Sequence, residues 1–387
     1  AMPIEELMGV EVSTVLGASR YEQRISDAPA SISIITSQDI KRYGYRTMAD
    51  VLNSVPGLYV TSDRNYGYLG AGGFLRQGDC NTRMLLLVDG HRMNNNIYDT
   101  AAVGNDLILD LDLVDRIEVI RGPGSSLYGS NAFFGVINVI TKGAGHVSGL
   151  ELSAEAGSSD ANKQRATFGR AFGRGLEMVL SATRYSSRGQ SLYYKEYDSP
   201  ATNSGRSDGN DHEGYSSFFT NLRIHGLDVQ AAYGSRAKGI PTGAWGTVFN
   251  DDRTKSTDTQ GYIDVRYRRA LKDNQDLSVR VFYDYYRYDG KYLFDYPPLT
   301  MNRDLAVGKW WGTEAFYKTR IKDRHTVIAG LEYRDNLVQQ QKNYDDSPHA
   351  VYLDDDRGSY SLGAYAQGEF VVTDRVLVNL GARYDHY

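Results

Sequence analysis

A glycine-rich run from Arg121 to Ser130 is the stretch whose residue types and spacing come closest to a site for chemistry. Backbone N–H groups in such a loop can cradle a phosphate, and Gly124 to Ser130 has the glycine spacing of a nucleotide-binding loop. Ser130, however, stands where that loop needs the lysine that reaches the β- and γ-phosphates. Gly122 to Ser126 also lacks the last glycine of the G-x-S-x-G elbow of serine hydrolases. The run therefore supports neither nucleotide binding nor hydrolysis.

Histidine and cysteine, the other residues that commonly carry chemistry, are not arranged as a site. The seven histidines, among them His91, His212 and His325, are scattered without the spacing of metal ligands. The single cysteine, Cys80, can form neither an internal disulfide nor a thiolate metal cluster. We therefore expect a protein that is not an enzyme and that has no catalytic residues, no cofactor and no metal ligands.

Size and charge narrow the class of protein. The 387 residues suffice for two or three domains, and 43 Lys and Arg stand against 48 Asp and Glu, a formal net charge of −5. A nucleic-acid groove normally shows a basic stripe, so nucleic acid is not an expected partner. The longest aliphatic run, Met84 to Val88, is far shorter than a membrane-spanning helix. Residues 1–6 do not resemble a secretion signal, so we expect a processed or engineered start.

The elements that must position any site fall into two halves of different pattern. Up to about residue 142, short apolar runs alternate with capped helical segments, which predicts an α/β domain. Ser37 is the expected N-cap of a helix from Gln38 to Tyr43 that Gly44 ends, and Thr47 begins a second helix that runs to Ser54. The expected strands include Met84 to Val88, Val114 to Ile120 and Gly135 to Thr141.

From about residue 149 the pattern has a period of two. In Leu277 to Tyr288, for example, Val279, Val281 and Tyr283 alternate with polar or charged residues. About eleven such runs follow one another, joined by short turns at one end and long loops at the other. This is the pattern of an antiparallel transmembrane β-barrel, although a soluble β-sandwich or repeat array also alternates. The expected long loops are Ser187 to Gly214, Lys238 to Thr257, Tyr288 to Val307 and Gln339 to Gly358.

Several ordered motifs in the first half resemble the plug domain of the TonB-dependent outer-membrane receptors of Gram-negative bacteria. The resemblance implies three regions: an N-terminal segment at 1–27, a plug at 28–142 and the first part of the barrel at 143–387. The motifs that carry it are Ala28 to Ile35, Ala49 to Val60, Arg83 to Gly90, Ile117 to Pro123, Leu127 to Ala132 and Gly135 to Lys142.

The chain departs from the family pattern in its plug. Gly72-Gly73-Phe74 stands where the family usually has Arg-Gly-Phe, so one plug arginine that typically pairs with barrel carboxylates is absent. We expect Arg76, Arg83 and Arg121 to form the plug–barrel lock instead, with ordinary surface charge as the alternative.

Length is the second departure. The family's barrels have twenty-two strands, and residues 143–387 provide about half of one. Because an open half-sheet leaves unpaired edges in lipid, we expect a fragment, a partial structure, or a split receptor completed by a second polypeptide. A closed barrel of eleven strands is the alternative.

The segment Glu11, Val12, Ser13, Thr14 and Val15 resembles a TonB box, by which the periplasmic protein TonB grips the receptor. An extended, mobile strand offers backbone donors and acceptors to a partner, which is the physical basis of β-augmentation. The alternative is that these β-prone residues form the first strand of the plug.

The resemblance implies active transport of a scarce, bulky nutrient across the outer membrane, driven through TonB with ExbB and ExbD in a lipid-embedded barrel. A ferric siderophore is the first expectation; cobalamin, haem, or a non-transporting binding or adhesion role are alternatives. The expected ligand contacts are Arg64, Tyr66, Tyr68 and Tyr98, whose aromatic faces and one cation suit a bulky anionic chelate. Acidic loops at 208–211 and 354–356 could also hold Ca²⁺.

Overall fold

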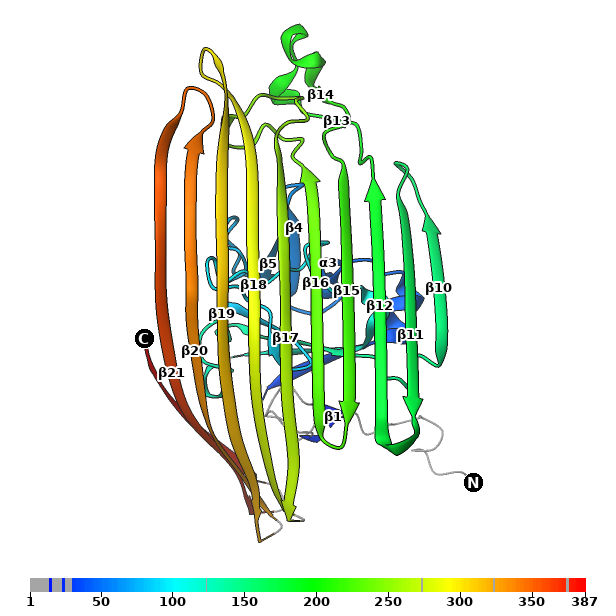
Figure 1. Ribbon diagram of the computed structural model, residues 1–387, viewed down its shortest axis with the longest axis vertical. Helices are drawn as coiled ribbons and strands as arrows, with labels where there is room; N and C mark the ends of the chain where they lie inside the picture. The colour runs from blue at the N-terminus through cyan, green and yellow to red at the C-terminus, as the bar shows by residue number, and fades with distance from the viewer. Residues whose placement is uncertain are drawn as a thin grey trace.

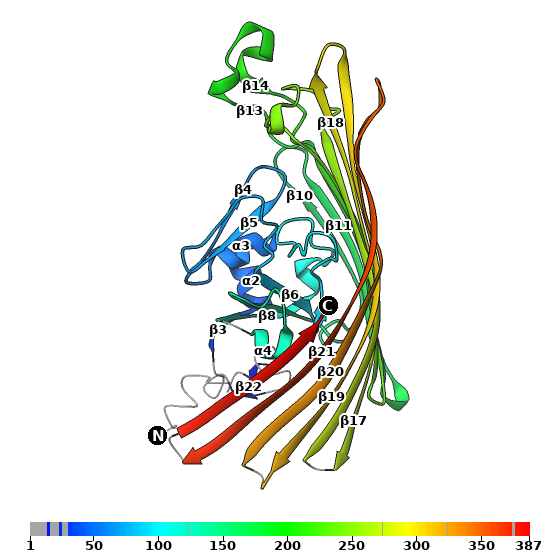
Figure 2. The same ribbon diagram turned by 90° about the vertical axis from the view of Figure 1, so that its left-hand side faces the viewer.

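The computed structural model describes residues 14–15, 23–24, 30–122, 124–272, 274–322, 324–373 and 376–387. A small α/β domain lies against the concave face of one large curved antiparallel sheet (Figures 1 and 2). The small domain is the predicted plug, and the large sheet is the predicted partial barrel. The predicted fold class is therefore confirmed.

The large sheet contains eleven strands that pair in chain order, each antiparallel to the next. Strands β18 to β21 have 21 to 24 residues, about twice the length that a tilted strand needs to cross a bilayer. They are therefore longer than the apolar layer of a bilayer requires. The strands are β10 (Gly149–Ala156), β11 (Asn162–Phe172), β12 (Leu176–Ser187), β15 (Glu213–Ile224), β16 (Leu227–Gly239), β17 (Lys255–Lys272), β18 (Gln275–Asp295), β19 (Leu299–Ile321), β20 (His325–Asp345), β21 (Ala350–Thr373) and β22 (Val376–His386).

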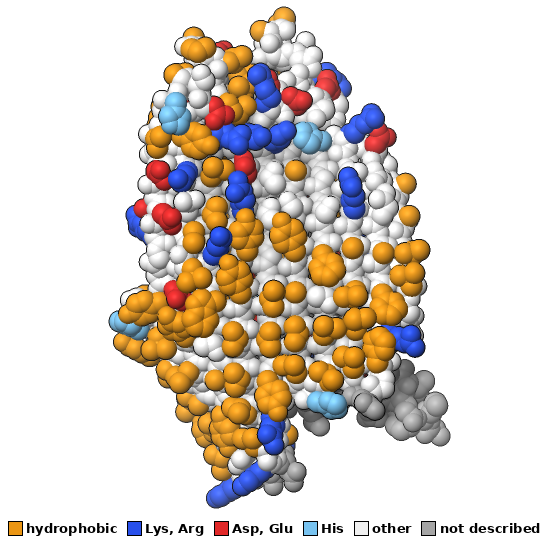
Figure 3. Space-filling view, viewed as in Figure 1, with side chains coloured by type: hydrophobic (Ala, Val, Ile, Leu, Met, Phe, Trp, Pro, Cys, Tyr) orange, Lys and Arg blue, Asp and Glu red, His pale blue; other side chains and the backbone are white. Residues whose placement is uncertain are grey.

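The two faces of this sheet differ as the period-two pattern predicted. On β18, Val279, Val281 and Tyr283 are exposed on the outer face, whereas Arg280 and Asp284 are buried against the plug. Figure 3 shows the outer side chains as a broad apolar band, with most charged side chains gathered near the upper end. The band is the surface that lipid would cover.

Two of the predicted long loops are wrong. β18 continues to Asp295 and β19 begins at Leu299, so most of Tyr288 to Val307 is strand, and the same holds for Gln339 to Gly358 at β20 and β21. These strand ends carry polar side chains on both faces, and such a segment lacks the alternation that identifies a half-buried strand.

The remaining long connections contain short elements of their own. They are β13 (Leu192–Tyr193), β14 (Arg206–Ser207) and the 3₁₀ turns η4 (Lys195–Tyr197) and η5 (Pro200–Gly205) in one loop, and η6 (Ala244–Gly246) in the next. Two further 3₁₀ turns are η2 (Leu111–Leu113), in the plug, and η3 (Gly173–Gly175), between β11 and β12.

The plug is built on a five-stranded sheet in the order β3-β8-β9-β6-β7, in which β6 runs parallel to β9. β6 is buried throughout because both of its faces are covered, and its unbroken apolar sequence fits that position. The strands are β3 (Ser31–Thr36), β6 (Met84–Val88), β7 (His91–Arg92), β8 (Val114–Arg121) and β9 (Gly135–Thr141), with a separate hairpin of β4 (Leu58–Ser62) and β5 (Gly67–Ala71).

Helices α2 (Ser37–Tyr43) and α3 (Met48–Asn53) begin with capping boxes. The Thr36 hydroxyl accepts from the Asp39 backbone N–H, and the Asp39 carboxylate accepts from the Thr36 N–H. The N-cap of α2 is thus Thr36, one residue before the predicted Ser37. Gly44 ends α2 with φ of 69°, and Thr47 caps α3, both as predicted. A third helix, α4 (Ser125–Tyr128), lies in the glycine-rich run.

One apolar cluster joins the plug to the large sheet. Buried plug side chains such as Leu52 and Ile117 belong to the same cluster as Phe219 of β15 and Tyr262 of β17. The plug is therefore held against strands β12 to β17 by packing as well as by polar contacts. Within the described residues, no helix has the length and apolar character needed to cross a membrane.

Candidate ligand-binding site

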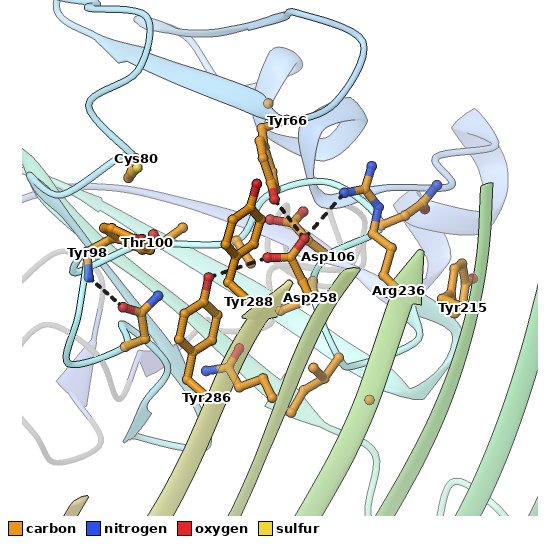
Figure 4. Close-up of a pocket in the computed structure, with 18 of the residues that line it drawn as sticks. Tyr66, Cys80, Tyr98, Thr100, Asp106, Tyr215, Arg236, Asp258, Tyr286 and Tyr288 are labelled. Atoms are coloured by element: carbon orange, nitrogen blue, oxygen red, sulfur yellow. Dashed lines mark hydrogen bonds and ion pairs between the residues drawn. The ribbon is translucent and has the colours of Figure 1, made fainter. Parts of the chain in front are cut away.

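A cavity of about 370 Å³ lies between the top of the plug and the upper parts of the large sheet (Figure 4). Its plug side follows hairpin β4–β5 and the loops after β5 and β7, and its wall comes from β15 to β19. Aromatic side chains dominate the lining, which suits a site for a bulky organic ligand. The tyrosines are Tyr66, Tyr68 and Tyr98 from the plug and Tyr215, Tyr286, Tyr288 and Tyr292 from the wall.

Asp258 of β17 is the polar centre of this cavity. Its carboxylate accepts from the Tyr66 hydroxyl at 2.8 Å and from the Tyr286 hydroxyl at 3.4 Å (Figure 4). Tyr66 belongs to the plug, so this carboxylate links plug and wall inside the cavity. Two further wall tyrosines, Tyr288 and Tyr292, contact each other through their hydroxyls.

Arg236 of β16 supplies a cation to the lining, and two of its three guanidinium nitrogens donate hydrogen bonds. Nε donates to Glu213 at 2.5 Å, and one terminal nitrogen donates to the Asn65 carbonyl at 2.7 Å. The other terminal nitrogen lies 4.0 Å from Asp258. The guanidinium also lies over the Tyr66 ring, 5.6 Å from its centroid. Arg236 therefore holds the plug hairpin against the wall.

Burial controls the protonation of the plug groups in the cavity. It raises the pKa of Tyr66 well above its ordinary value, and Asp258 adds to the shift. Burial also raises the pKa of Asp106, although the neighbouring Arg236 guanidinium acts in the opposite direction. The phenol of Tyr66 thus stays neutral and able to donate a hydrogen bond.

Three of the four predicted ligand contacts come together in this cavity. Tyr66, Tyr68 and Tyr98 line it, whereas Arg64 forms an ion pair with Asp211 at the base of the loop between β12 and β15. Tyr68 is 8% exposed, and its hydroxyl donates to Asp63 at 2.8 Å. The ligand-contact role of these residues stays a prediction.

The sequence reasoning missed the wall of the cavity. Tyr286 lies at an inner position of the period-two pattern, whereas Tyr288 and Tyr292 fell in a segment that the sequence predicted to be a long loop. What the pattern could not show is which inner residues lie level with the top of the plug. The missed wall residues are Arg236, Asp258, Tyr286, Tyr288 and Tyr292, and Asp106 of the plug was missed as well.

Below the cavity, His91 fixes the plug to the wall. Nδ1 of His91 lies 3.0 Å from the Asp264 carboxylate and Nε2 lies 2.9 Å from the Asp284 carboxylate. Since ionised carboxylates only accept hydrogen bonds, both ring nitrogens must be donors and the ring is an imidazolium. The ring is 2% exposed and stacks on Tyr262, with centroids 4.1 Å apart.

The charges of Asp264 and Asp284 also favour the protonated form of His91. Burial alone would lower the pKa of His91, but Asp284 and Asp264 outweigh it and raise the pKa to about 9. Asp264 also pairs with Arg280 at 3.0 Å. We call His91, Asp264, Asp284 and Arg280 the His91 lock.

Backbone contacts next to His91 reinforce this lock. Arg266 donates to the Asp89 carbonyl at 2.8 Å, and Arg280 donates to the Gly90 carbonyl at 2.5 Å. The Asp89 carboxylate accepts from Gln230 of β16 at 2.6 Å. The turn after β6 is therefore bound to three neighbouring wall strands.

Arg76, Arg83 and Arg121 were predicted to form the plug–barrel lock, and that role stays a prediction. Arg121 donates to the Pro56 carbonyl at 2.6 Å and to the Ser31 hydroxyl at 2.7 Å, both within the plug. Arg83 lies over the ring of Phe134, also in the plug, and Arg76 is exposed. In the contacts around the His91 lock that the structure describes, the guanidinium groups come from the wall, and the plug contributes His91.

Of the predicted TonB box, Glu11, Val12 and Ser13 lie outside the described residues. Thr14–Val15 form β1, which pairs antiparallel with β2 (Gln23–Arg24). This short pairing fits the alternative that the segment contributes a strand, and contact with TonB stays a prediction.

The acidic loops considered for Ca²⁺ are engaged in ion pairs. Asp211 lies 2.8 Å from the Lys238 amine, and Asp354 lies 3.1 Å from the Lys342 amine. Among the described residues, no three His, Cys, Asp or Glu side chains gather in an arrangement that could hold a metal ion.

Comparison with known proteins agrees with this architecture. The TonB-dependent receptor plug domain matches residues 24–136, and the TonB dependent receptor-like beta-barrel matches residues 196–387. The chain belongs to the TonB-dependent receptors. As a member of this family, it is a protein of the outer membrane of a Gram-negative bacterium.

Individual relatives cover different parts of this receptor chain. The vitamin B12 transporter BtuB of Vibrio cholerae is 30% identical over 354 residues, which are 88% of this chain and 54% of the relative. The iron-regulated outer membrane virulence protein of Vibrio cholerae is 41% identical over 132 residues, 33% of this chain and 20% of the relative. The chain spans about half the length of the relative that covers most of it.

Solved structures show the same fold. The ferric yersiniabactin uptake receptor FyuA of Yersinia pestis is 17% identical, with a TM-score of 0.70 over 92% of this chain and 56% of that one. The ferripyoverdine receptor of Pseudomonas aeruginosa is 16% identical, with a TM-score of 0.71 over 96% of this chain and 54% of that one.

His91→Gln is expected to loosen the plug, because a neutral amide cannot neutralise two buried carboxylates. Removing one partner of a buried ion pair typically costs about 3–5 kcal/mol. Amide hydrogen exchange in β6, measured by mass spectrometry on the solubilised protein, should therefore accelerate. His146→Gln is the matched control, because the His146 side chain is 63% exposed. Unchanged β6 protection in His91→Gln would contradict the lock.

The His91 lock also predicts a pH dependence. The folded pKa of about 9 lies above the ordinary value of 6.5, so the lock stabilises the protein fully below pH 6.5 and is lost as the pH rises through 9. The difference in urea unfolding midpoint between wild type and His91→Gln should shrink across this interval. A difference that grows with pH would show that His91 is neutral when buried.

Proposed function

We propose that this receptor binds a scarce, bulky nutrient at the cell surface and releases it inward when TonB moves the plug. The observation that carries the proposal is that the cavity is built from both parts: Tyr66 and Tyr98 come from the plug, and Arg236 and Tyr286 come from the wall. A ligand bound there contacts the part that must move and the part that stays in the membrane.

The direction of transport follows from the placement of the loops. Outer-membrane barrels have short periplasmic turns and longer extracellular loops. Here the longer connections, residues 188–212 and 240–254, lie at the upper end of the sheet (Figure 1). The plug and its His91 lock lie between the cavity and the periplasm, so binding alone does not give passage.

The energy has to come from another protein. In the part of the chain that the structure describes we assign no arrangement to bond breaking, and we propose that the receptor is not an enzyme. The resemblance to the family implies that TonB, with ExbB and ExbD, provides the energy for transport by pulling on the N-terminal segment. A mobile strand such as residues 11–15 is suited to this because backbone pairing transmits force with little side-chain specificity.

Two ligand classes fit the proposal. A ferric siderophore is a bulky chelate, and an aromatic cavity with few, directed polar groups is suited to it. Cobalamin is the second candidate, favoured by the 30% identity with the vitamin B12 transporter BtuB over 88% of this chain. The alternative of a non-transporting binding protein predicts that the N-terminal segment is dispensable.

Deletion of residues 11–15 separates transport from binding. We expect uptake of a radiolabelled ligand into cells to be abolished, with surface binding unchanged, because the cavity is built from residues outside this segment. The control is a strain that carries the intact receptor and lacks TonB, which should show the same phenotype. Uptake that survives the deletion would contradict the proposed function.

Tyr286→Ala tests the cavity itself. Tyr286 is 8% exposed on the inner face of β18. Removing its ring and its hydroxyl should weaken ligand binding about tenfold or more, as for a buried aromatic contact. Tyr285→Ala is the matched control, because Tyr285 is the next residue of the same strand and faces outward. Equal affinities of the two variants, measured by equilibrium binding to the purified receptor, would place the ligand elsewhere.

A further inference from the structure

The charges around the cavity carry information about the ligand. Among the described residues that line it are three carboxylates, Asp106, Asp258 and Asp304, and one cation, Arg236. Asp106 comes from the plug, and the other two come from different wall strands. Negative charge therefore surrounds the cavity from both parts of the receptor.

The cation is not available to a ligand. Arg236 is 6% exposed, and two of its nitrogens donate to Glu213 and to the Asn65 carbonyl. The third nitrogen, Nη1, is buried without a hydrogen-bond partner and lies 4.0 Å from the Asp258 carboxylate. The ion pair with Glu213 cancels its charge locally. Arg64, the cation expected from the sequence to meet an anionic chelate, pairs instead with Asp211. An anionic group would thus meet carboxylates with no free cation among the described lining residues.

The tyrosines favour the same kind of ligand. The ring faces of Tyr66, Tyr98, Tyr286 and Tyr288 are electron-rich and attract cations. Two of these hydroxyls donate to Asp258, so the free acceptor positions of that carboxylate are the strongest polar feature left for a ligand. A ligand group that donates hydrogen bonds can bind at these acceptor positions of Asp258, and a group that only accepts hydrogen bonds cannot.

We propose that this cavity selects a ligand without net negative charge, either uncharged or cationic, which donates hydrogen bonds to Asp258 and Asp106. Polyanionic chelates are excluded by repulsion, because like charges placed together across an interface are strongly unfavourable. This inference rests on the proposed function and narrows its ligand class. Corrinoids and uncharged or cationic iron chelates meet the requirement.

The test compares three probes on the full receptor, purified in detergent at low ionic strength. They are cyanocobalamin, a cationic tris-hydroxamate complex of iron(III) and a polyanionic tris-catecholate complex of iron(III). We expect the polyanionic complex to bind at least about tenfold more weakly than the better of the other two. Raising the salt concentration should reduce this difference, because salt screens the repulsion.

Asp258→Asn removes one negative charge at nearly constant shape. We expect weaker binding of the preferred probe and about tenfold tighter binding of the polyanionic complex. Asp354→Asn is the matched control, because Asp354 is exposed and paired with Lys342, away from the cavity lining. If Asp258→Asn does not fold, Asp304→Asn gives the same comparison from a less buried position on β19.

The outcomes separate the two proposals. Tightest binding of the polyanionic complex, unchanged by Asp258→Asn and Asp304→Asn and followed by its TonB-dependent uptake, overturns the charge inference and leaves the proposed function standing. Binding of none of the probes, with no TonB-dependent uptake of any, overturns both. A shift in preference toward the polyanion in the aspartate variants, with no shift in Asp354→Asn, supports the inference.

Discussion

The burial of two wall carboxylates is the constraint on which the rest of this structure depends. Asp264 and Asp284 face the inside of the sheet because their strand neighbours must face lipid, and there they lie beneath the plug with almost no access to water. Arg280 of the wall pairs with Asp264, and His91 of the plug contacts both carboxylates with its two ring nitrogens. The plug position is therefore set by charge compensation as well as by apolar packing. The turn after β6 places His91 where its ring can donate to the two wall carboxylates.

The same two wall strands connect this lock with the cavity above it. β18 carries Asp284 in the lock and Tyr286 in the cavity, two residues or about 7 Å apart along the strand. β17 carries Asp264 and Asp258, about 20 Å apart. A β-strand paired on both sides is a rigid element, so a ligand that changes the contacts of Tyr286 or Asp258 acts on the strands that hold the lock. In the proposed function, these shared strands would connect ligand binding in the cavity with retention of the plug.

The sequence predicted the features that depend on neighbouring residues, such as the inner face of a strand and the ends of a helix. The period of two on β18 assigned Arg280 and Asp284 to the inner face, and Gly44 and Thr47 ended and began helices as expected, while the N-cap of α2 lay one residue from its predicted place. Contacts between distant residues were beyond such signals. His91 contacts Asp264 and Asp284, which lie 173 and 193 residues further along the chain, and Arg64 pairs with Asp211, which lies 147 residues away. These contacts depend on where the plug lies along the strands of the sheet, and the sequence does not show that position. Tyr66 and Tyr98 follow plug strands and Tyr68 lies in β5, so the sequence could nominate these three tyrosines, but it could not identify the wall residues that complete their cavity.

The hydrogen bond between Tyr66 and Asp258 joins the chemistry of the cavity to movement of the plug. The Tyr66 hydroxyl of the plug lies 2.8 Å from the Asp258 carboxylate of the wall. A ligand with hydrogen-bond donors would bind to the same carboxylate. A donor on the ligand competes with the Tyr66 phenol, whose raised pKa keeps it neutral and makes it the weaker partner when a charged donor is present. An accepting or anionic ligand offers no such exchange and leaves the contact intact. In the proposed function, the carboxylate that selects the ligand also releases the top of the plug, because both events involve the hydrogen bond between Tyr66 and Asp258.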